Sequence, residues 1–227
     1  MAGYVFFDFF GTLADYDPSI HPEVNAPLAF ARRVASDISR VESDARWQRA
    51  WDELDAQAAR TGREFSMEQV ARRYWRSIGS PPLRSGGIEQ LVDEYLDAWT
   101  ANVAPAAHAL ECVTDLASDH TLAVVSNTHD PRLVPRLIRR FGLLPAIGDV
   151  TTSVDVGWRK PHRAIFEAAL RRHSVDARDV VFVGDNWAAD IEGPRAVGMS
   201  AVYVGHPTDS RAGVSLTDLP DVVRSLG

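Results

Sequence analysis

The sequence predicts an α/β fold in which a parallel, doubly wound sheet carries a separate all-helical insert. Two patterns support this fold class. Short apolar runs rich in β-branched and aromatic residues recur along the chain, and helical patterns separate them. Residues 14–103 break this alternation and show successive helical patterns instead. Strands that alternate with helices favour a parallel sheet, because each helix returns the chain to the same end of the sheet.

The expected sheet consists of five strands. They lie at residues 4–7, 121–125, 149–153, 180–183 and 201–204. The run at 149–153 has the weakest strand pattern. It follows a helical stretch, residues 132–141, that we expect Gly142 to end. Five strands are enough for a doubly wound core, which we place at residues 1–13 and 104–227.

The insert, residues 14–103, is expected to be a bundle of helices. Helical patterns cover residues 24–38, 45–59, 67–78 and 88–101, and turn-rich segments at 61–63 and 79–87 separate them. Ser66 and Gln69 predict a capping box at the start of the third pattern. Six aromatic residues recur at helical spacing, which we interpret as the packing of a small bundle: Trp47, Trp51, Tyr74, Trp75, Tyr95 and Trp99.

Composition and charge argue against several classes of function. The 227 residues carry a formal net charge of −7, which gives no electrostatic footprint for nucleic acid or an anionic membrane. Cys112 is the single cysteine, so it cannot form an internal disulfide, and we interpret it as a small core residue of a helix. The sequence shows neither a long apolar run that would span a membrane nor an export signal, so we expect a cytoplasmic protein.

Polar residues follow three of the expected strands. Asp8 comes directly after the first strand, Ser126 and Asn127 after the second, and Asp185 follows residues 180–183 by one glycine. Ligands of an open parallel sheet bind at the carboxyl ends of the strands. Separate chain segments would therefore bring these groups to one place.

Four segments resemble, in order, the four motifs of the haloacid dehalogenase-like hydrolases. They read DFFGTL at 8–13, VVSNT at 124–128, GWRKP at 157–161 and GDNWAAD at 184–190. The resemblance implies a Rossmann-like hydrolase core. It also implies that residues 14–103 form a cap domain inserted after the first motif, with the active site between cap and core. Members with such a cap generally act on small soluble molecules, because the closing cap excludes large ones.

The resemblance implies a role for each motif residue. Asp8 is expected to be the nucleophile, since a carboxylate can attack phosphorus or carbon and form an aspartyl intermediate. Lys160 is expected to offset the charge of the nucleophile and of the transferring group. Thr12, Ser126 and Asn127 are expected to bind the phosphoryl oxygens of the substrate.

The resemblance also implies a magnesium site. Its expected ligands are Asp8, the backbone carbonyl of Phe10, Asp185 and Asp190, since hard oxygen donors suit Mg²⁺. We expect Asp190 to be the member that orients a ligand or a bound water.

Phe10 departs from the family pattern. Most phosphatases of this family carry a second acid here, which protonates the leaving group and activates the hydrolytic water, a contribution typically worth about 10²- to 10⁴-fold. Three explanations stay open. The leaving group departs without a proton, as in an acyl phosphate, an anhydride or an aryl phosphate. Asp15, Asp17 or His21 supplies the proton instead. Or the chain is not a phosphatase.

Our leading hypothesis is a magnesium-dependent phosphatase of a small phosphorylated metabolite, with an aspartyl-phosphate at Asp8. One alternative is a metal-free 2-haloacid dehalogenase with an aspartyl ester at Asp8, because dehalogenases of this family also carry an aromatic residue at the position of Phe10. Against it, those enzymes replace the Gly-Asp of the fourth motif, which Gly184 and Asp185 retain. Another alternative is a catalytically weak binding or regulatory protein. We expect a monomer or homodimer with a small-molecule substrate and no nucleic-acid or membrane partner.

Overall fold

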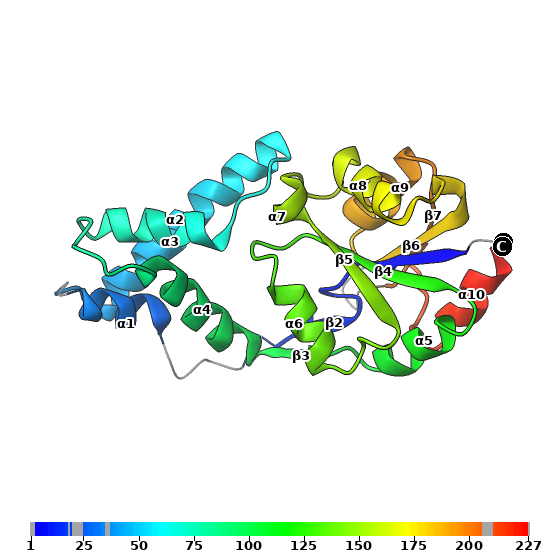
Figure 1. Ribbon diagram of the computed structural model, residues 1–227, viewed down its shortest axis with the longest axis horizontal. Coiled ribbons are helices and arrows are strands. Elements are labelled where there is room, and N and C mark those ends of the chain that lie inside the picture. Colours follow the sequence, from blue (N-terminus) through cyan, green and yellow to red (C-terminus); the bar gives the residue numbers. More distant parts are fainter. Residues whose placement is uncertain (1–2, 18, 20–24, 35–36, 206–210, 227) are drawn as a thin grey trace. The chain divides into compact units, whose positions relative to one another are not determined.

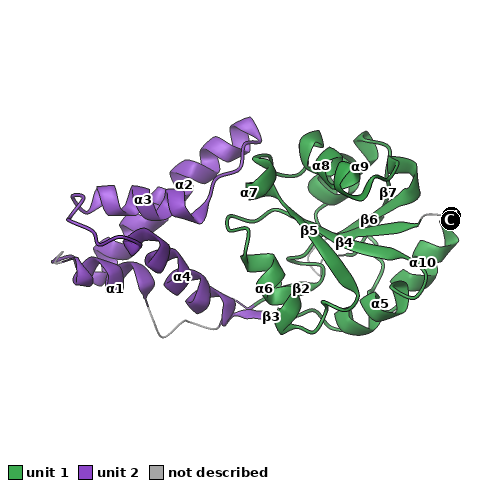
Figure 2. Cartoon of the chain, in the orientation of Figure 1, with its two compact units in different colours: residues 1–16, 104–227 green, residues 17–103 purple. Residues whose placement is uncertain are grey.

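The chain forms two compact units. The computed structural model describes residues 3–17, 19, 25–34, 37–205 and 211–226. Unit 1 comprises residues Met1–Tyr16 and Ala104–Gly227, and unit 2 comprises residues Asp17–Val103 (Figure 2). Unit 1 extends beyond the first motif to Tyr16, because residues Ala14–Tyr16 form a short strand, β2, that pairs with β3 (Val103–Pro105).

Unit 1 contains a five-stranded parallel sheet, which confirms the predicted fold class (Figure 1). Its strand order is β5-β4-β1-β6-β7, and every neighbouring pair is parallel. The strands are β1 (Tyr4–Phe7), β4 (Thr121–Ser126), β5 (Ile147–Thr152), β6 (Val180–Gly184) and β7 (Ser200–Tyr203). The chain adds strands first on one side of β1 and then on the other, so the sheet is doubly wound.

Helices cover both faces of this sheet, with α8 and α9 on one face and α5 and α10 on the other (Figure 1). The helices of unit 1 are α5 (Ala109–Leu116), α6 (Leu133–Arg140), α7 (Ser153–Val156), α8 (Arg163–His173), α9 (Gly193–Ala196) and α10 (Leu219–Ser225), with a 3₁₀ turn, η1 (Ala177–Asp179), and a π-helical turn, η2 (Trp187–Glu192). Because both faces are covered, successive residues Val5, Phe6 and Phe7 of β1 are all completely buried. Burial also raises the pKa of the Cys112 thiol in α5 to about 12.

Strand β5 shows how capping sets the end of an element. Its strand pattern in the sequence is weak, yet it pairs with β4 as far as Thr152. The Thr152 side chain accepts a hydrogen bond from the backbone N–H of Asp155 at 3.3 Å, so it ends the strand and caps α7. The preceding helix, α6, ends before Gly142, whose φ of +73° is the left-handed conformation that favours glycine.

Unit 2 is helical in its described part. Its helices are α1 (Ala26–Arg33), α2 (Arg40–Thr61), α3 (Met67–Ser77) and α4 (Gly87–Thr100). Helix α2 begins at Arg40 rather than at residue 45, because Ser39 caps it by accepting a hydrogen bond from Glu42 N at 3.2 Å. The predicted capping box of Ser66 and Gln69 is confirmed at the start of α3. Among the described helices, none combines the length and apolar composition needed to cross a membrane.

Aromatic side chains pack the interior of unit 2. Tyr74 is completely buried, and its ring meets Trp47 edge-on with centroids 5.5 Å apart. Trp47 also contacts Tyr95 at 4.7 Å, and Trp51 meets Phe65 at 5.5 Å. The spacing of these residues along the helices therefore reflects packing within the bundle.

Replacing Tyr74 by phenylalanine tests a buried hydroxyl network in this bundle. Tyr74 Oη donates a hydrogen bond to the carbonyl oxygen of Pro27 at 3.1 Å and lies 2.7 Å from Ser43 Oγ. Tyr74→Phe leaves the completely buried Ser43 hydroxyl without this partner, so we expect the free energy of unfolding to fall by about 1–3 kcal/mol. Chemical denaturation measures the change. Adding Ser43→Ala should recover part of the loss, and unchanged stability of Tyr74→Phe would contradict the prediction.

An exposed cluster of Arg224, Asp115 and Asp119 should make the stability of the fold vary with pH. This guanidinium lies 2.9 Å from both Asp115 and Asp119, and its hydrogen bonds lower the pKa of Asp115 and lower that of Asp119 to about 2. A carboxyl group whose pKa is depressed in the folded state stabilises the fold above its unfolded pKa of about 3.9, and this stabilisation is lost as the pH falls toward the folded value. We expect Arg224→Gln to lower the melting temperature slightly at neutral pH, with the difference from wild type shrinking below pH about 4. Calorimetry over this range checks it, and a difference independent of pH would refute the assignment.

Candidate active site

The predicted site residues lie around the carboxyl end of β1. Phe7, the last residue of β1, pairs with Val124 of β4 on one side and with Val183 of β6 on the other. Asp8 follows directly, and its backbone N–H donates to the carbonyl oxygen of Val183 at 2.8 Å. Because the chain adds strands on opposite sides of β1, Asp8 stands at the switch point of the topology, where open α/β sheets bind ligands.

Three carboxylates gather at this edge of the sheet. Oxygen atoms of Asp8, Asp185 and Asp190 all lie within 4.8 Å of one another. Asp190 is completely buried, Asp8 is buried and Asp185 is half-buried. Two glycines make room for them: a Cβ at Gly11 would overlap the carboxylate of Asp185, and a Cβ at Gly184 would overlap the side chain of Asp190.

The ammonium group of Lys160 lies between two of these acids. Lys160 belongs to the loop between α7 and α8, and its side chain is only 2% exposed. Nζ lies 2.6 Å from Asp8 Oδ1 and 2.7 Å from Asp190 Oδ1. Three carboxylates face this one ammonium, so the cluster carries excess negative charge when its acids are ionised.

The pKa values of the cluster reflect this charge. Burial raises the pKa of Asp8 to about 7, helped by the charge of Asp190 and opposed by Lys160. Burial and Asp190 also raise the pKa of Asp185. Burial alone would lower the pKa of Lys160, but the charges of Asp8 and Asp190 outweigh it and raise that pKa, so Lys160 keeps its proton. A bound cation would favour the ionised carboxylates, and the oxygen-only donor set fits Mg²⁺.

A π-helical turn brings Asp190 into the cluster. Turn η2 follows Asn186, whose Oδ1 accepts a hydrogen bond from Ala189 N at 3.0 Å. Asn186 N in turn donates to Asp190 Oδ2 at 3.0 Å, while Asp190 Oδ1 forms an ion pair with Lys160 Nζ at 2.7 Å. The sequence pattern does not predict this turn, although π-helical turns are frequent at functional sites. One oxygen of Asp190 thus accepts a backbone hydrogen bond, and the other forms the ion pair with Lys160.

The three residues expected to bind the phosphoryl group contact other site residues. Thr12 Oγ1 donates to Asp185 Oδ1 at 3.4 Å, and Ser126 Oγ donates to the carbonyl oxygen of Asn127 at 3.4 Å. The Asn127 amide binds the backbone of Lys160: Lys160 N donates to Oδ1 at 2.7 Å, and Nδ2 donates to the Lys160 carbonyl oxygen at 3.1 Å. Sequence reasoning misses this link, because 33 residues separate the two and no local pattern connects them.

Phe10 occupies the position of the second acid. Its side chain is half-buried, and its ring meets that of Phe9 edge-on with centroids 5.0 Å apart. Phe9 is completely buried and stacks on Phe141 at 6.5 Å. Position 10 therefore belongs to an aromatic cluster and offers no ionisable group.

The other proton donors considered for the site differ in their surroundings. Asp15 is exposed on β2. Hydrogen bonds from Ser19 lower the pKa of the exposed Asp17, which keeps this carboxylate ionised at neutral pH. His21 lies outside the described residues. Neither Asp15 nor Asp17 belongs to the described cluster of Asp8, Asp185 and Asp190.

Known phosphatases resemble this chain in sequence. It is 26% identical to the ribulose-1,5-bisphosphate 5-phosphatase of Halopiger xanaduensis over 213 residues, which are 93% of this chain and 88% of that protein. It is 36% identical to the glyceraldehyde 3-phosphate phosphatase of Methanothermobacter thermautotrophicus over 111 residues, which are 48% of this chain and 49% of that protein.

Solved structures share the fold. The 2-haloacid dehalogenase from Pseudomonas syringae aligns over the full length of both chains with a TM-score of 0.71 and 26% identity. The family model of the haloacid dehalogenase-like hydrolases matches residues 3–198, a range that includes all four motifs. This match, the parallel sheet and the helices inserted after β2 agree with one another, and the chain belongs to the haloacid dehalogenase-like hydrolases.

Proposed function

We propose that the protein is a magnesium-dependent phosphatase that acts on a small phosphorylated metabolite through an aspartyl-phosphate at Asp8. The observation that carries this proposal is the cluster of Asp8, Asp185 and Asp190 around the ammonium of Lys160. Like charges at such distances repel strongly in a poorly solvated site. A further cation would let all three acids stay ionised beside an anionic phosphoryl group, and a substrate bound together with Mg²⁺ would supply it.

The donors of the cluster fit that ion. Carboxylate oxygens are hard ligands, and Gly11 and Gly184 keep the space beside them free of a Cβ. We assign the metal to Asp8, Asp185 and Asp190, together with the backbone carbonyl of Phe10. When bound, Mg²⁺ would neutralise charge on the phosphoryl oxygens.

Asp8 forms the covalent bond in the proposed reaction. One of its carboxylate oxygens attacks phosphorus, and the bond from phosphorus to the leaving oxygen breaks with its electron pair on that oxygen. Water then attacks the phosphorus of the aspartyl-phosphate, and the bond from phosphorus to the Asp8 oxygen breaks with its electron pair on that oxygen. Both protons of the water leave with the inorganic phosphate, and the Asp8 carboxylate is restored. Lys160, 2.6 Å from Asp8 Oδ1, orients the nucleophile and compensates charge in the transition state. We propose that Thr12, Ser126 and Asn127 line the place where the phosphoryl oxygens of the substrate bind.

Phe10 narrows the class of substrate. A phenyl ring can neither give a proton to the leaving oxygen nor take one from water. A leaving group that departs as a stable anion does not need the first of these steps. We therefore favour an acyl phosphate, a phosphoanhydride or an aryl phosphate over a simple alkyl ester.

The names of the relatives support a small phosphorylated substrate. Both phosphatases are named for small phosphorylated compounds, ribulose-1,5-bisphosphate and glyceraldehyde 3-phosphate. We extend to the present chain only the small size and the phosphoryl group, because both named compounds are alkyl phosphate esters and Phe10 favours a better leaving group. We further propose that it works in the cytoplasm as a monomer or homodimer, without a nucleic-acid or membrane partner.

A metal-free 2-haloacid dehalogenase is the second candidate, and Phe10 favours it because a halide leaves without a proton. Sequence identity does not separate the two, since the dehalogenase from Pseudomonas syringae and the phosphatase from Halopiger xanaduensis are both 26% identical to this chain. The charges favour the phosphatase. A haloacid is itself a carboxylate, so without a metal it would have to bind beside three acids that one ammonium only partly offsets.

A substrate panel tests metal, reaction and nucleophile together. Acetyl phosphate, p-nitrophenyl phosphate, glycerol phosphate and 2-chloropropionate are assayed with Mg²⁺ and with EDTA. We expect phosphate release from the first two compounds with Mg²⁺, background release with EDTA, and a loss of at least about 10³-fold in Asp8→Asn, because this variant lacks the nucleophile. Chloride release that survives EDTA, without any phosphate release, would establish the dehalogenase instead.

Restoring the acid at position 10 tests the leaving-group argument. We expect Phe10→Asp to raise turnover of glycerol phosphate by about 10²-fold or more, since general acid catalysis becomes available, and to change acetyl phosphate turnover much less. Phe10→Asn is the matched control, because the asparagine side chain has the same shape as aspartate and cannot supply a proton at neutral pH. Circular dichroism confirms that both variants fold. An absence of gain in folded Phe10→Asp would contradict the leaving-group argument and would point to a missing substrate pocket or to a different reaction.

A further inference from the structure

We propose that Asn127 is a positioning residue, whose side-chain amide fixes the backbone of Lys160 and so determines where the Lys160 ammonium stands beside Asp8. The predicted effect on turnover rests on the proposed phosphatase function, whereas the predicted effect on the Lys160 backbone does not. It differs from the expectation that Asn127 acts by touching the phosphoryl group.

Asn127 stands on a rigid support. It directly follows β4, which lies in the sheet between β1 and β5. The last two residues of β4, Val125 and Ser126, are completely buried and pair with Thr151 and Thr152 of β5. A side chain at this point is therefore held by the same sheet that carries Asp8 at the end of β1.

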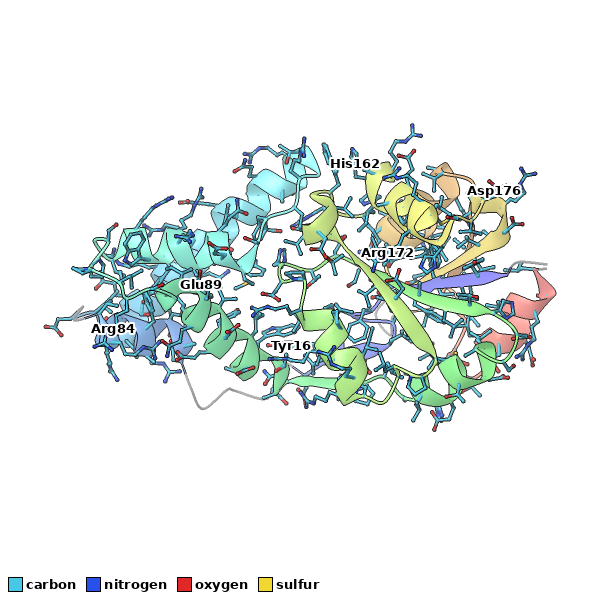
Figure 3. The ribbon with its side chains drawn as sticks, in the orientation of Figure 1. Tyr16, Arg84, Glu89, His162, Arg172 and Asp176 are labelled. Atoms are coloured by element: carbon cyan, nitrogen blue, oxygen red, sulfur yellow. The ribbon has the colours of Figure 1, made fainter. Side chains whose placement is uncertain are left out.

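The loop that carries Lys160 has contacts of its own. His162 N donates to the carbonyl oxygen of Arg159 at 2.9 Å, and the His162 ring stacks on Trp158 with centroids 3.8 Å apart. His162, labelled in Figure 3, also caps α8, because its Nδ1 accepts a hydrogen bond from Ala164 N at 3.2 Å. These contacts order the loop and tie it to α8, but they do not reach the end of β4.

The Asn127 amide connects this loop to the sheet at Lys160 itself. Oδ1 accepts from Lys160 N at 2.7 Å, and Nδ2 donates to the Lys160 carbonyl oxygen at 3.1 Å. Because these two groups flank the Cα of Lys160, the pair of bonds fixes both the position and the rotation of the backbone from which the side chain departs. Lysine has a long, flexible stem, so its ammonium is a well-placed point charge only when its backbone is held.

The two hydrogen bonds between the Asn127 amide and the Lys160 backbone, here called the clamp, hold the position of the Lys160 ammonium. Nζ lies within hydrogen-bond distance of Asp8 and Asp190 at once, at 2.6 and 2.7 Å. A shift of the loop would change both distances and leave the ammonium with several positions instead of one. Misplacement of a catalytic group by about 1 Å can reduce a rate by about 10²-fold. Asn127 would thus affect the reaction through Lys160.

A double-mutant cycle tests this role. Asn127→Ala, Lys160→Met and the double variant are assayed with Mg²⁺ and p-nitrophenyl phosphate, with kcat and KM determined separately. We expect Asn127→Ala to lower kcat by about 10- to 100-fold with KM changed less than about threefold, and to change kcat less than about threefold once Lys160 is methionine. Lys160→Gln is the alternative background if Lys160→Met does not fold. Equal losses in both backgrounds, or a loss confined to KM, would overturn the proposal in favour of a direct substrate contact.

Ser153→Ala is the matched control. The completely buried Ser153 hydroxyl accepts a hydrogen bond from Thr128 N at 2.9 Å and donates to the Thr128 carbonyl oxygen at 3.2 Å. It therefore supports the same loop one residue after Asn127. We expect this variant to lose thermal stability while its kcat stays within about threefold of wild type, and an equal loss of kcat in both variants would show that Asn127 has only a structural role.

Hydrogen exchange separates failure of this proposal from failure of the proposed function. Asn127→Ala should accelerate amide exchange in residues 157–162, and Ser153→Ala should not, because only the first substitution releases Lys160. If wild type lacks magnesium-dependent phosphatase activity and exchange still rises, the proposed function fails and the clamp stands. If wild type is active and Asn127→Ala leaves exchange in this loop unchanged, the clamp fails.

Discussion

The ion pairs of Lys160 with Asp8 and Asp190 are the interaction on which the candidate site depends. They join the end of β1, the loop before α8 and the π-helical turn after β6, which are far apart in the sequence. A buried ammonium is stable only when opposite charges compensate it, so these three segments constrain one another. The arrangement also leaves Asp185 beside these ion pairs, so the ionised acids would outnumber the one ammonium. The contacts that order the site therefore also gather the carboxylates to which we propose that Mg²⁺ binds.

Phe10 and the acid cluster divide the chemistry of the site between them. In the proposed reaction, the carboxylates decide what can be bound, because their charge has to be offset before an anion can approach. In the same reaction, position 10 decides which group can leave, because its aromatic side chain moves no proton. Relatives of equal similarity carry out phosphate and halide chemistry according to their names, so similarity of the whole chain says less about the reaction than these few side chains do.

Much of the fold could be predicted from the sequence, for a physical reason. Strands buried on both faces read as short apolar runs, and those at Val180–Gly184 and Tyr4–Phe7 stand out clearly. Helix ends were harder to predict where a cap extends a helix, as Ser39 does for α2. In the site, residues directly after strands could be identified individually. Their partners could not, since the contact between Asn127 and Lys160 and the π-helical turn that brings Asp190 to Lys160 arise only when distant segments fold together.

The short ladder of β2 and β3 has a consequence for how such chains diversify. The chain leaves unit 1 through β2 and returns through β3, and these strands are paired. Leu13 accepts a hydrogen bond from Ala106 N at 3.0 Å, and Asp17 N donates to the carbonyl oxygen of Asn102 at 2.8 Å, so the two connections run side by side. An insert whose ends already meet imposes no spacing on the sheet that carries it. Helices of other lengths, or a plain hairpin, could replace the insert without moving Asp8, so unit 2 can change in length and sequence while the carboxylate cluster of unit 1 stays the same.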